Sequence, residues 1–185
     1  MQTAIYKLTM RNGLFMGLLF SVNFLFSSSR NVTLMLLTYV VMAFIIWGTY
    51  RMTRQFRDKE QGGYISYWRA VYYVILLFFF SSIISALIKI GYTSYINTEY
   101  LPQLFEEGIR QIENNRALFE SLNIPIGEEY IDQLEQQYRP VPYAFQTIWV
   151  NILSGTILGL IVGGIVRHKK GLFDDDLPAS THSEI

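Results

Sequence analysis

The chain has 185 residues, of which 51% are hydrophobic, 16% aromatic and only 16% charged. The charged share lies well below the roughly 25% of an ordinary soluble protein, and the length fits one domain. The absence of cysteine excludes disulfides, thiolate chemistry and cysteine-ligated metals. Because Lys plus Arg equals Asp plus Glu, the net charge predicts no nucleic-acid partner. The composition favours lipid as the main solvent of this chain.

Four stretches of the chain carry no charge. They cover residues 12–29, 31–50, 70–88 and 140–166. A helix needs about 20 apolar residues to cross a hydrocarbon core about 30 Å thick, and backbone groups in lipid must pair within the segment. The third stretch is expected to continue past Lys89 to Ile96. We predict an all-α, polytopic membrane protein with four transmembrane helices over about 8–28, 31–50, 69–96 and 143–166.

The first span has a second interpretation. Lys7 and Arg11 precede an apolar run, as in a secretory signal peptide. Cleavage would have to use the residues from Ser27 to Ser29, which match a cleavage site poorly, and the next apolar stretch starts at once. We expect this segment to be retained as half of a membrane hairpin, with a cleaved signal as the alternative.

Cations are distributed unevenly between the two ends of such a bundle. The side with the N-terminus, the 51–69 link and the C-terminal tail carries ten of them, and the other side carries four. Cytoplasmic loops are enriched in Lys and Arg. We therefore expect a multi-pass membrane protein with both termini in the cytoplasm. Residues 171–185 are predicted to form a disordered cytoplasmic tail.

Residues 97–142 form the longest segment outside the predicted spans. They hold nine acids and three arginines, and their apolar residues recur three and four positions apart, first from Leu101 to Leu122 and then from Ile126 to Tyr138. This spacing predicts two amphipathic helices in an extracytoplasmic insert between the third and fourth spans. The apolar stripes are expected to pack on each other and on the spans; the alternative is that they face a partner protein or a second copy.

Apart from Arg11 and Arg69 at span ends, Lys89 is the one charge within a predicted span, and the antiparallel order of the helices brings other polar residues to a similar depth. We hypothesise a polar layer in the outer third of the membrane; the simpler alternative is an ammonium that reaches outward, with scattered interhelical hydrogen bonds. No span contains Asp or Glu, which weighs against proton- or sodium-coupled transport. The candidate members of the layer are Asn23, Thr38, Ser85, Lys89, Asn151 and Ser154.

Glycines recur every fourth residue in two spans. Such spacing produces a flat surface where helix backbones approach closely, so it predicts helix packing, often described as a glycine zipper. We expect a contact within the chain, with a contact between copies as the alternative. The residues concerned are Gly13 and Gly17 in the first span and Gly155, Gly159 and Gly163 in the fourth.

Catalytic signatures are missing from the sequence. The two histidines have no carboxylate or second histidine at ligand spacing, and no nucleophile or phosphate-loop motif occurs. Paired acids in the insert and three aspartates in the tail are weak signals for a divalent cation and are expected to be solvated. We predict no enzyme activity, cofactor or metal. Basic residues near the inner ends suit anionic lipid headgroups: Arg51, Arg54, Arg57, Arg167, Lys169 and Lys170.

One short stretch, from Gly62 to Ala70, has the sequence GGYISYWRA and leads into the third span. It resembles the entry to that helix in the bacterial membrane family catalogued as domain of unknown function 4199. The order of two close spans, a basic link, a third span, a Glu-rich helical loop and a final span with a basic end is also similar over nearly the whole chain. The resemblance implies an integral inner-membrane protein and supplies no activity, substrate or catalytic residue.

The leading functional hypothesis is a non-enzymatic interaction or structural component, which contacts the lipid bilayer and presents the insert to an envelope protein or to another copy. The alternative is a small transporter or channel component that uses the polar layer around Lys89.

Overall fold

The computed structural model describes residues 2–29, 31–122 and 126–168. Within these residues the chain is helical, without a named strand, and four helices are long and apolar enough to cross a membrane. The predicted all-α class and the four candidate spans are thereby confirmed. The elements are α1 (Gln2–Ser27), α2 (Val32–Glu60), α3 (Tyr67–Gly91), the π-helical η1 (Tyr92–Ile96), α4 (Tyr100–Asn114), α5 (Arg116–Ser121), α6 (Glu128–Gln137) and α7 (Pro140–Val166).

Local sequence signals explain where several helices begin. The side chain of Asn31 accepts a hydrogen bond from the backbone N–H of Thr33 (2.9 Å) and caps α2. Pro140 occupies the first turn of α7, where a missing N–H costs nothing. Between α2 and α3 the chain turns through Gly62 and Gly63, whose positive φ angles of 64° and 87° favour glycine.

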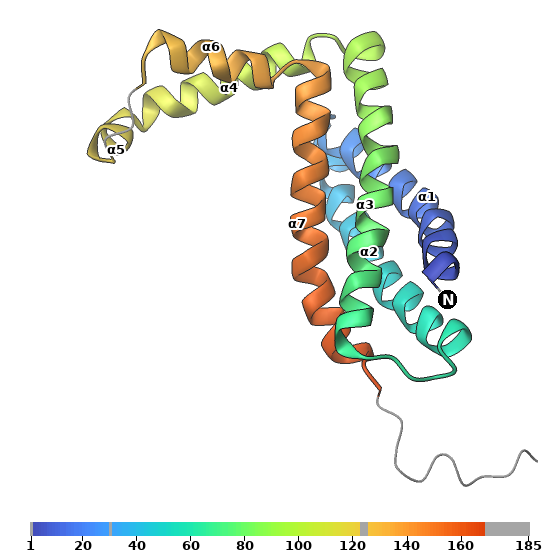
Figure 1. The fold of residues 1–185 in the computed structure, drawn as a ribbon. Helices are drawn as coiled ribbons and strands as arrows, with labels where there is room; N and C mark the ends of the chain where they lie inside the picture. Colours follow the sequence, from blue (N-terminus) through green and yellow to red (C-terminus); the bar gives the residue numbers. More distant parts are fainter. Residues whose placement is uncertain (1, 30, 123–125, 169–185) are drawn as a thin grey trace, which may run out of the picture.

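The third helix is central to the bundle. It lies between α1 and α7 and has extensive contacts with both, whereas α2 packs mainly on α1 and touches α3 and α7 only sparingly (Figure 1). The N-terminal half of α2 is exposed on most sides, including Val32, Leu36 and Tyr39. A helix in this position presents its apolar residues to lipid.

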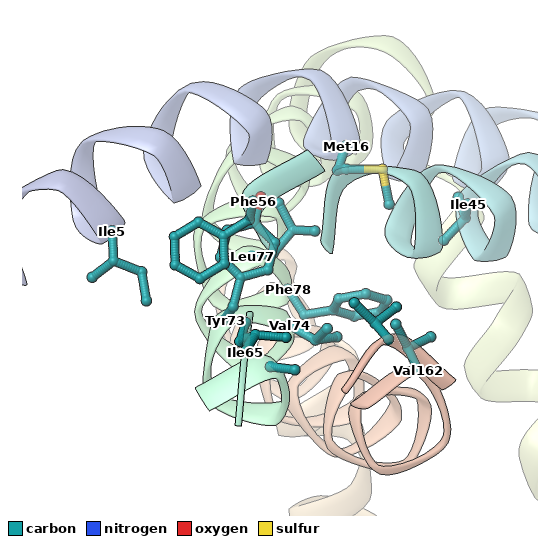
Figure 2. Close-up of a cluster of buried hydrophobic side chains, with 12 residues drawn as sticks. Ile5, Met16, Ile45, Phe56, Ile65, Tyr73, Val74, Leu77, Phe78 and Val162 are labelled. Atoms are coloured by element: carbon teal, nitrogen blue, oxygen red, sulfur yellow. The ribbon is translucent and has the colours of Figure 1, made fainter. Parts of the chain in front are cut away.

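The densest packing lies around α3 (Figure 2). The rings of Phe56 from α2 and Tyr73 from α3 stack with centroids 4.5 Å apart, beside Met16 and Leu77. Tyr73 is fully buried, and its hydroxyl accepts a hydrogen bond from the Asn12 amide at 2.9 Å. This core ties the first three helices together.

Buried hydroxyl groups in the spans are mostly satisfied by their own helices. Thr9, Thr49, Thr53 and Ser81 each donate to the carbonyl four residues earlier, at 2.6–2.7 Å. Such back-bonding removes the cost of a polar side chain away from water. These residues therefore need no partner on another helix.

The segment between α3 and α7 forms a helical hairpin that extends sideways from the end of the bundle opposite the N-terminus (Figure 1). Its two longer helices, α4 and α6, contact each other through Phe105 and Tyr138, whose rings are 5.8 Å apart. The apolar stripes therefore pack partly on each other, as expected. Leu118 and Leu122 near the tip are 57% and 61% exposed.

Helix boundaries differ from the sequence-based prediction at several places: α1 already begins at Gln2, and the last residues of the predicted third helix form the π-helical η1. The second helix continues ten residues beyond Tyr50, and this polar end carries an i,i+4 ion pair between Arg54 and Asp58 (3.6 Å). The first insert helix is not continuous: α4 ends at Asn114, and the Asn115 side chain donates to the Gln111 carbonyl before α5 begins. The predicted disordered tail at 171–185 lies outside the described residues.

Candidate functional site

A polar cavity of about 160 Å³ lies near the hairpin end of the bundle, between α1, α3, α4 and α7. An engineered cavity of about 150 Å³ holds a benzene molecule, so this one has room for a small polar group. The described residues around it supply one cation and several amide and hydroxyl groups, and no carboxylate. Its lining consists of Phe20, Asn23, Phe24, Ser27, Ser85, Lys89, Tyr100, Tyr143 and Asn151.

Lys89 lies in the last turn of α3, and its ammonium points into a group of aromatic rings. The Nζ atom is 4.8 Å from the ring centre of Phe24 and 5.8 Å from that of Tyr143. It donates to the Thr147 hydroxyl at 3.3 Å, which itself donates to the Tyr143 carbonyl at 3.0 Å. Cation–π contacts of this kind partly replace the water that the ammonium has lost.

Four of the six residues predicted for the polar layer line this cavity: Asn23, Ser85, Lys89 and Asn151. Thr38 and Ser154 do not. Thr38 belongs to the N-terminal half of α2, and its hydroxyl oxygen is buried away from this cavity. Ser154 is exposed, and its hydroxyl donates to the Val150 carbonyl of its own helix at 2.8 Å. The predicted layer is thus smaller than expected and is confined to three helices of the bundle.

Two polar atoms at the cavity have no hydrogen-bond partner within the described part of the chain. They are the Ser85 hydroxyl oxygen, on a residue that is 1% exposed, and the Asn23 amide oxygen. The Thr38 hydroxyl oxygen also has no hydrogen-bond partner, but it does not lie at the cavity. A buried polar group without a partner costs free energy, so such groups indicate a water molecule or a ligand.

Sequence reasoning missed the aromatic and hydroxyl groups that complete the site. No role in the site was assigned from the sequence to Tyr100, Tyr143 or Thr147. Burial, followed by the neighbouring Tyr143 hydroxyl, raises the pKa of Tyr100, so its phenol stays protonated and able to donate. In the sequence, the one indication that Thr147 belongs to the site is its position one helical turn before Asn151.

Both glycine series face α3. A Cβ atom built on Gly155 would lie 2.5 Å from Cβ and Cγ of Phe78, and one on Gly163 would lie 2.9 Å from Val71. On α1, Cβ atoms at Gly13 and Gly17 would lie 2.7 Å from side-chain atoms of α3, and the contact at Gly159 with Val74 is 3.3 Å. These distances favour the contact within the chain over a contact between copies.

The three arginines in the C-terminal part of α2 differ in their surroundings. Arg51 lies over the ring of Trp47 at 5.1 Å, and Arg54 pairs with Asp58. Arg57 is mostly covered: its guanidinium binds Asp58 at 2.7 Å and donates to the Val166 carbonyl at 3.1 Å. The guanidinium of Arg57 therefore contacts protein. Arg167 is exposed, and Lys169 and Lys170 lie outside the described residues. For all of these residues except Arg57, the contact with lipid headgroups stays a prediction.

The end of the bundle opposite the hairpin also explains the short stretch from Gly62 to Ala70. After the two glycines, Ile65 and His168 exchange both backbone hydrogen bonds (3.0 and 3.1 Å), and the ring of Tyr64 stacks on His168. Ile65 is buried in the core. The stretch therefore fastens the α2–α3 link to the C-terminal end of α7.

Four apolar helices and a lateral helical hairpin define the class of this molecule as a multi-pass membrane protein. The chain belongs to the family described as "Protein of unknown function (DUF4199)", whose model matches residues 11–168. The predicted family is thereby confirmed. Comparison with curated proteins and with solved structures gives no match.

Proposed function

We propose that this protein is a non-enzymatic component of the bacterial inner membrane, with both termini in the cytoplasm, and that it presents the α4–α6 hairpin to a partner on the opposite side. The excess of cations at the end with the termini supports this orientation. The missing catalytic motifs support a role in interaction rather than chemistry.

The shape of the hairpin is the observation that carries the proposal. It is joined to the bundle at its base, where Leu101 is buried, and then extends away from the spanning helices (Figure 1). Leu118 and Leu122 remain exposed near the far end. Apolar side chains at the tip of a projecting segment are typical of a contact surface.

Charge distinguishes between the two kinds of partner. Residues 97–142 have a net charge of −6. Two copies of so acidic a segment repel each other, whereas a basic surface would be attracted. The proposed partner is therefore an envelope protein with a basic rim around an apolar contact, in preference to a second copy.

The partner is tested by photo-crosslinking in growing cells. A photoreactive amino acid at Leu118 is expected to yield one discrete protein adduct that Leu122→Glu weakens. The same amino acid at Gln133, an exposed position on α6, serves as the control. Adducts equally abundant and diverse at both positions, or only monomer at Leu118, would contradict the proposal.

The orientation is tested separately, since the chain lacks cysteine. Gln111→Cys in α4 is expected to react with a membrane-impermeant maleimide in spheroplasts. Gln61→Cys in the α2–α3 link is expected to react only after lysis. The reverse pattern would overturn the orientation and leave the fold intact.

A transporter or channel component is the second candidate, favoured by the polar cavity around Lys89. Its substrate would pass close to the ammonium, so Lys89→Met is expected to reduce flux in reconstituted vesicles. Unchanged flux would remove this candidate without affecting the hairpin proposal.

A further inference from the structure

The polar cavity around Lys89 continues into a second, apolar hollow. This groove has a volume of about 400 Å³ and lies between α1, α2, α3 and α7. Phe20, Asn23 and Asn151 line both spaces, so the two meet at these residues. Together they form one site with a polar end and an apolar end.

The polar end carries a positive charge that no described acid balances. Among the described residues, the Lys89 ammonium has a hydrogen bond to Thr147 and two aromatic rings nearby, and no ion pair. An ammonium has three donors, so two are available. The Ser85 hydroxyl, buried and without a partner, adds a further donor beside the same cavity. The Asn23 amide oxygen is an acceptor without a partner at the same cavity, but the amide groups of Asn23 and Asn151 also carry N–H donors. With the ammonium, these donors make the cavity complementary to an anion.

The apolar end has the dimensions of a hydrocarbon chain. Its walls include Met42 and Ile46 from α2 and Ile157 and Ile161 from α7. Along α7 the groove extends from Asn151 to Ile161, and a helix rises 1.5 Å per residue, so its length is about 15 Å. The sparse contact between α2 and α7 leaves this side of the bundle open.

We propose that this site binds an anionic amphiphile, with its carboxylate or phosphate at Lys89 and its chain in the groove between α2 and α7. The polar end lies toward the hairpin and the groove runs toward the bilayer centre, which is the orientation of a lipid in that leaflet. Two sources share this chemistry: a free fatty acid and an anionic phospholipid. The inference stands apart from the hairpin proposal, because it concerns different residues.

The test uses the full chain in phosphatidylcholine nanodiscs with three photoreactive probes. These are a diazirine-bearing fatty acid, a phosphatidylglycerol with the same acyl chain and a phosphatidylcholine with that chain. At least one anionic probe is expected to label the groove residues of α2 and α7 about tenfold more than phosphatidylcholine does. Labelling by the fatty acid alone identifies a free acid as ligand, and labelling by phosphatidylglycerol identifies a lipid.

Matched variants test the effect of the Lys89 charge and the effect of the groove's shape separately. Lys89→Met is expected to abolish the preference for the anionic probe, whereas Arg110→Gln, which removes an exposed cation of α4, leaves it unchanged. Ile157→Trp fills the groove and is expected to reduce labelling. Ile165→Trp adds the same ring at an exposed position of α7 outside the groove and is expected to have no effect.

Equal labelling by all three probes would overturn the proposal, as would a preference that survives Lys89→Met in a monodisperse protein. Should that variant fail to fold, the unaltered protein decides the matter by competition. The competitor matches the anionic probe that labels the protein. Excess dodecanoate or unlabelled phosphatidylglycerol is expected to suppress the labelling, whereas its uncharged or zwitterionic counterpart, dodecanol or phosphatidylcholine, is not. Equal suppression by the two compounds of a pair would show that no anion is recognised.

Discussion

The contact between α7 and α3 at Gly155 makes a quantitative prediction. Gly155→Ala adds one methyl group whose carbon would lie 2.5 Å from Cβ and Cγ of Phe78. Carbon atoms pack best at about 3.5–4.0 Å, so the two helices must separate by about 1 Å. Phe78 cannot relieve the clash by rotating its ring, because Cβ is fixed to the α3 backbone.

The expected cost follows from two opposing terms. Overpacking lowers the free energy of unfolding by about 1–3 kcal/mol. The higher helix propensity of alanine raises it by at most about 1 kcal/mol. Subtracting the full gain leaves a net cost of about 0–2 kcal/mol. Because the clash includes the fixed Cβ atom of Phe78, Gly155→Ala should lower the free energy of unfolding by an amount in the upper half of this range, about 1–2 kcal/mol. Gly164→Ala is the matched control on the same helix, since its Cβ would meet no atom within 4 Å, and it should be neutral or slightly stabilising.

The measurement is unfolding in mixed micelles by increasing dodecyl sulfate, followed by the near-ultraviolet circular dichroism of the buried aromatic rings. Size-exclusion chromatography with light scattering gives the oligomeric state of each variant. Equal stability of the two variants would refute the packing argument. A change of oligomeric state at Gly155→Ala, with unfolding unaltered, would show that the glycine face contacts another copy instead.

Further predictions concern the buried Tyr73 and the glycine turn between α2 and α3. Tyr73→Phe removes a hydroxyl that binds Asn12 in the core and should cost about 0.5–1.5 kcal/mol in the same unfolding assay, whereas Tyr72→Phe removes an exposed hydroxyl and should cost little. Equal losses would show that burial of the hydroxyl is irrelevant. Gly63→Ala forces a side chain into a φ of 87° and should cost about 1–2 kcal/mol, measured by the midpoint of thermal unfolding. Gly91→Ala, at a helical φ of −58° with no atom within 4 Å, is the control and should not lower the midpoint; a similar loss there would contradict the strain argument.

The fold was predictable because exclusion of charge is visible along the sequence itself. Stretches without a charge had the length of a bilayer crossing, and each became a helix of the structure. The polar layer was predicted only in part, since its members were chosen by depth. Helices that are apolar on all sides give no signal of which side faces a neighbour. That is why Thr38 was included and Thr147 was missed.

Contacts between distant parts of the chain were also beyond sequence reasoning. The backbone pairing of Ile65 with His168 joins residues more than a hundred positions apart, and no side-chain pattern in the sequence predicts this pairing. The glycine pair before Ile65 indicated a turn but not its partner. The hydrogen bond from Arg57 to the end of α7 belongs to the same junction, and its sequence context favoured a lipid contact instead.

The central place of α3 has a consequence for biosynthesis. The first two membrane segments leave the ribosome with only each other to bind, and their shared surface is modest beside the surface that each of α1 and α7 shares with the third. A nascent chain halted after α2 would therefore be a loose pair of helices in lipid, open to capture by membrane chaperones or proteases. Durable tertiary order begins when the third segment enters the bilayer, and the last segment then closes against a surface that already exists.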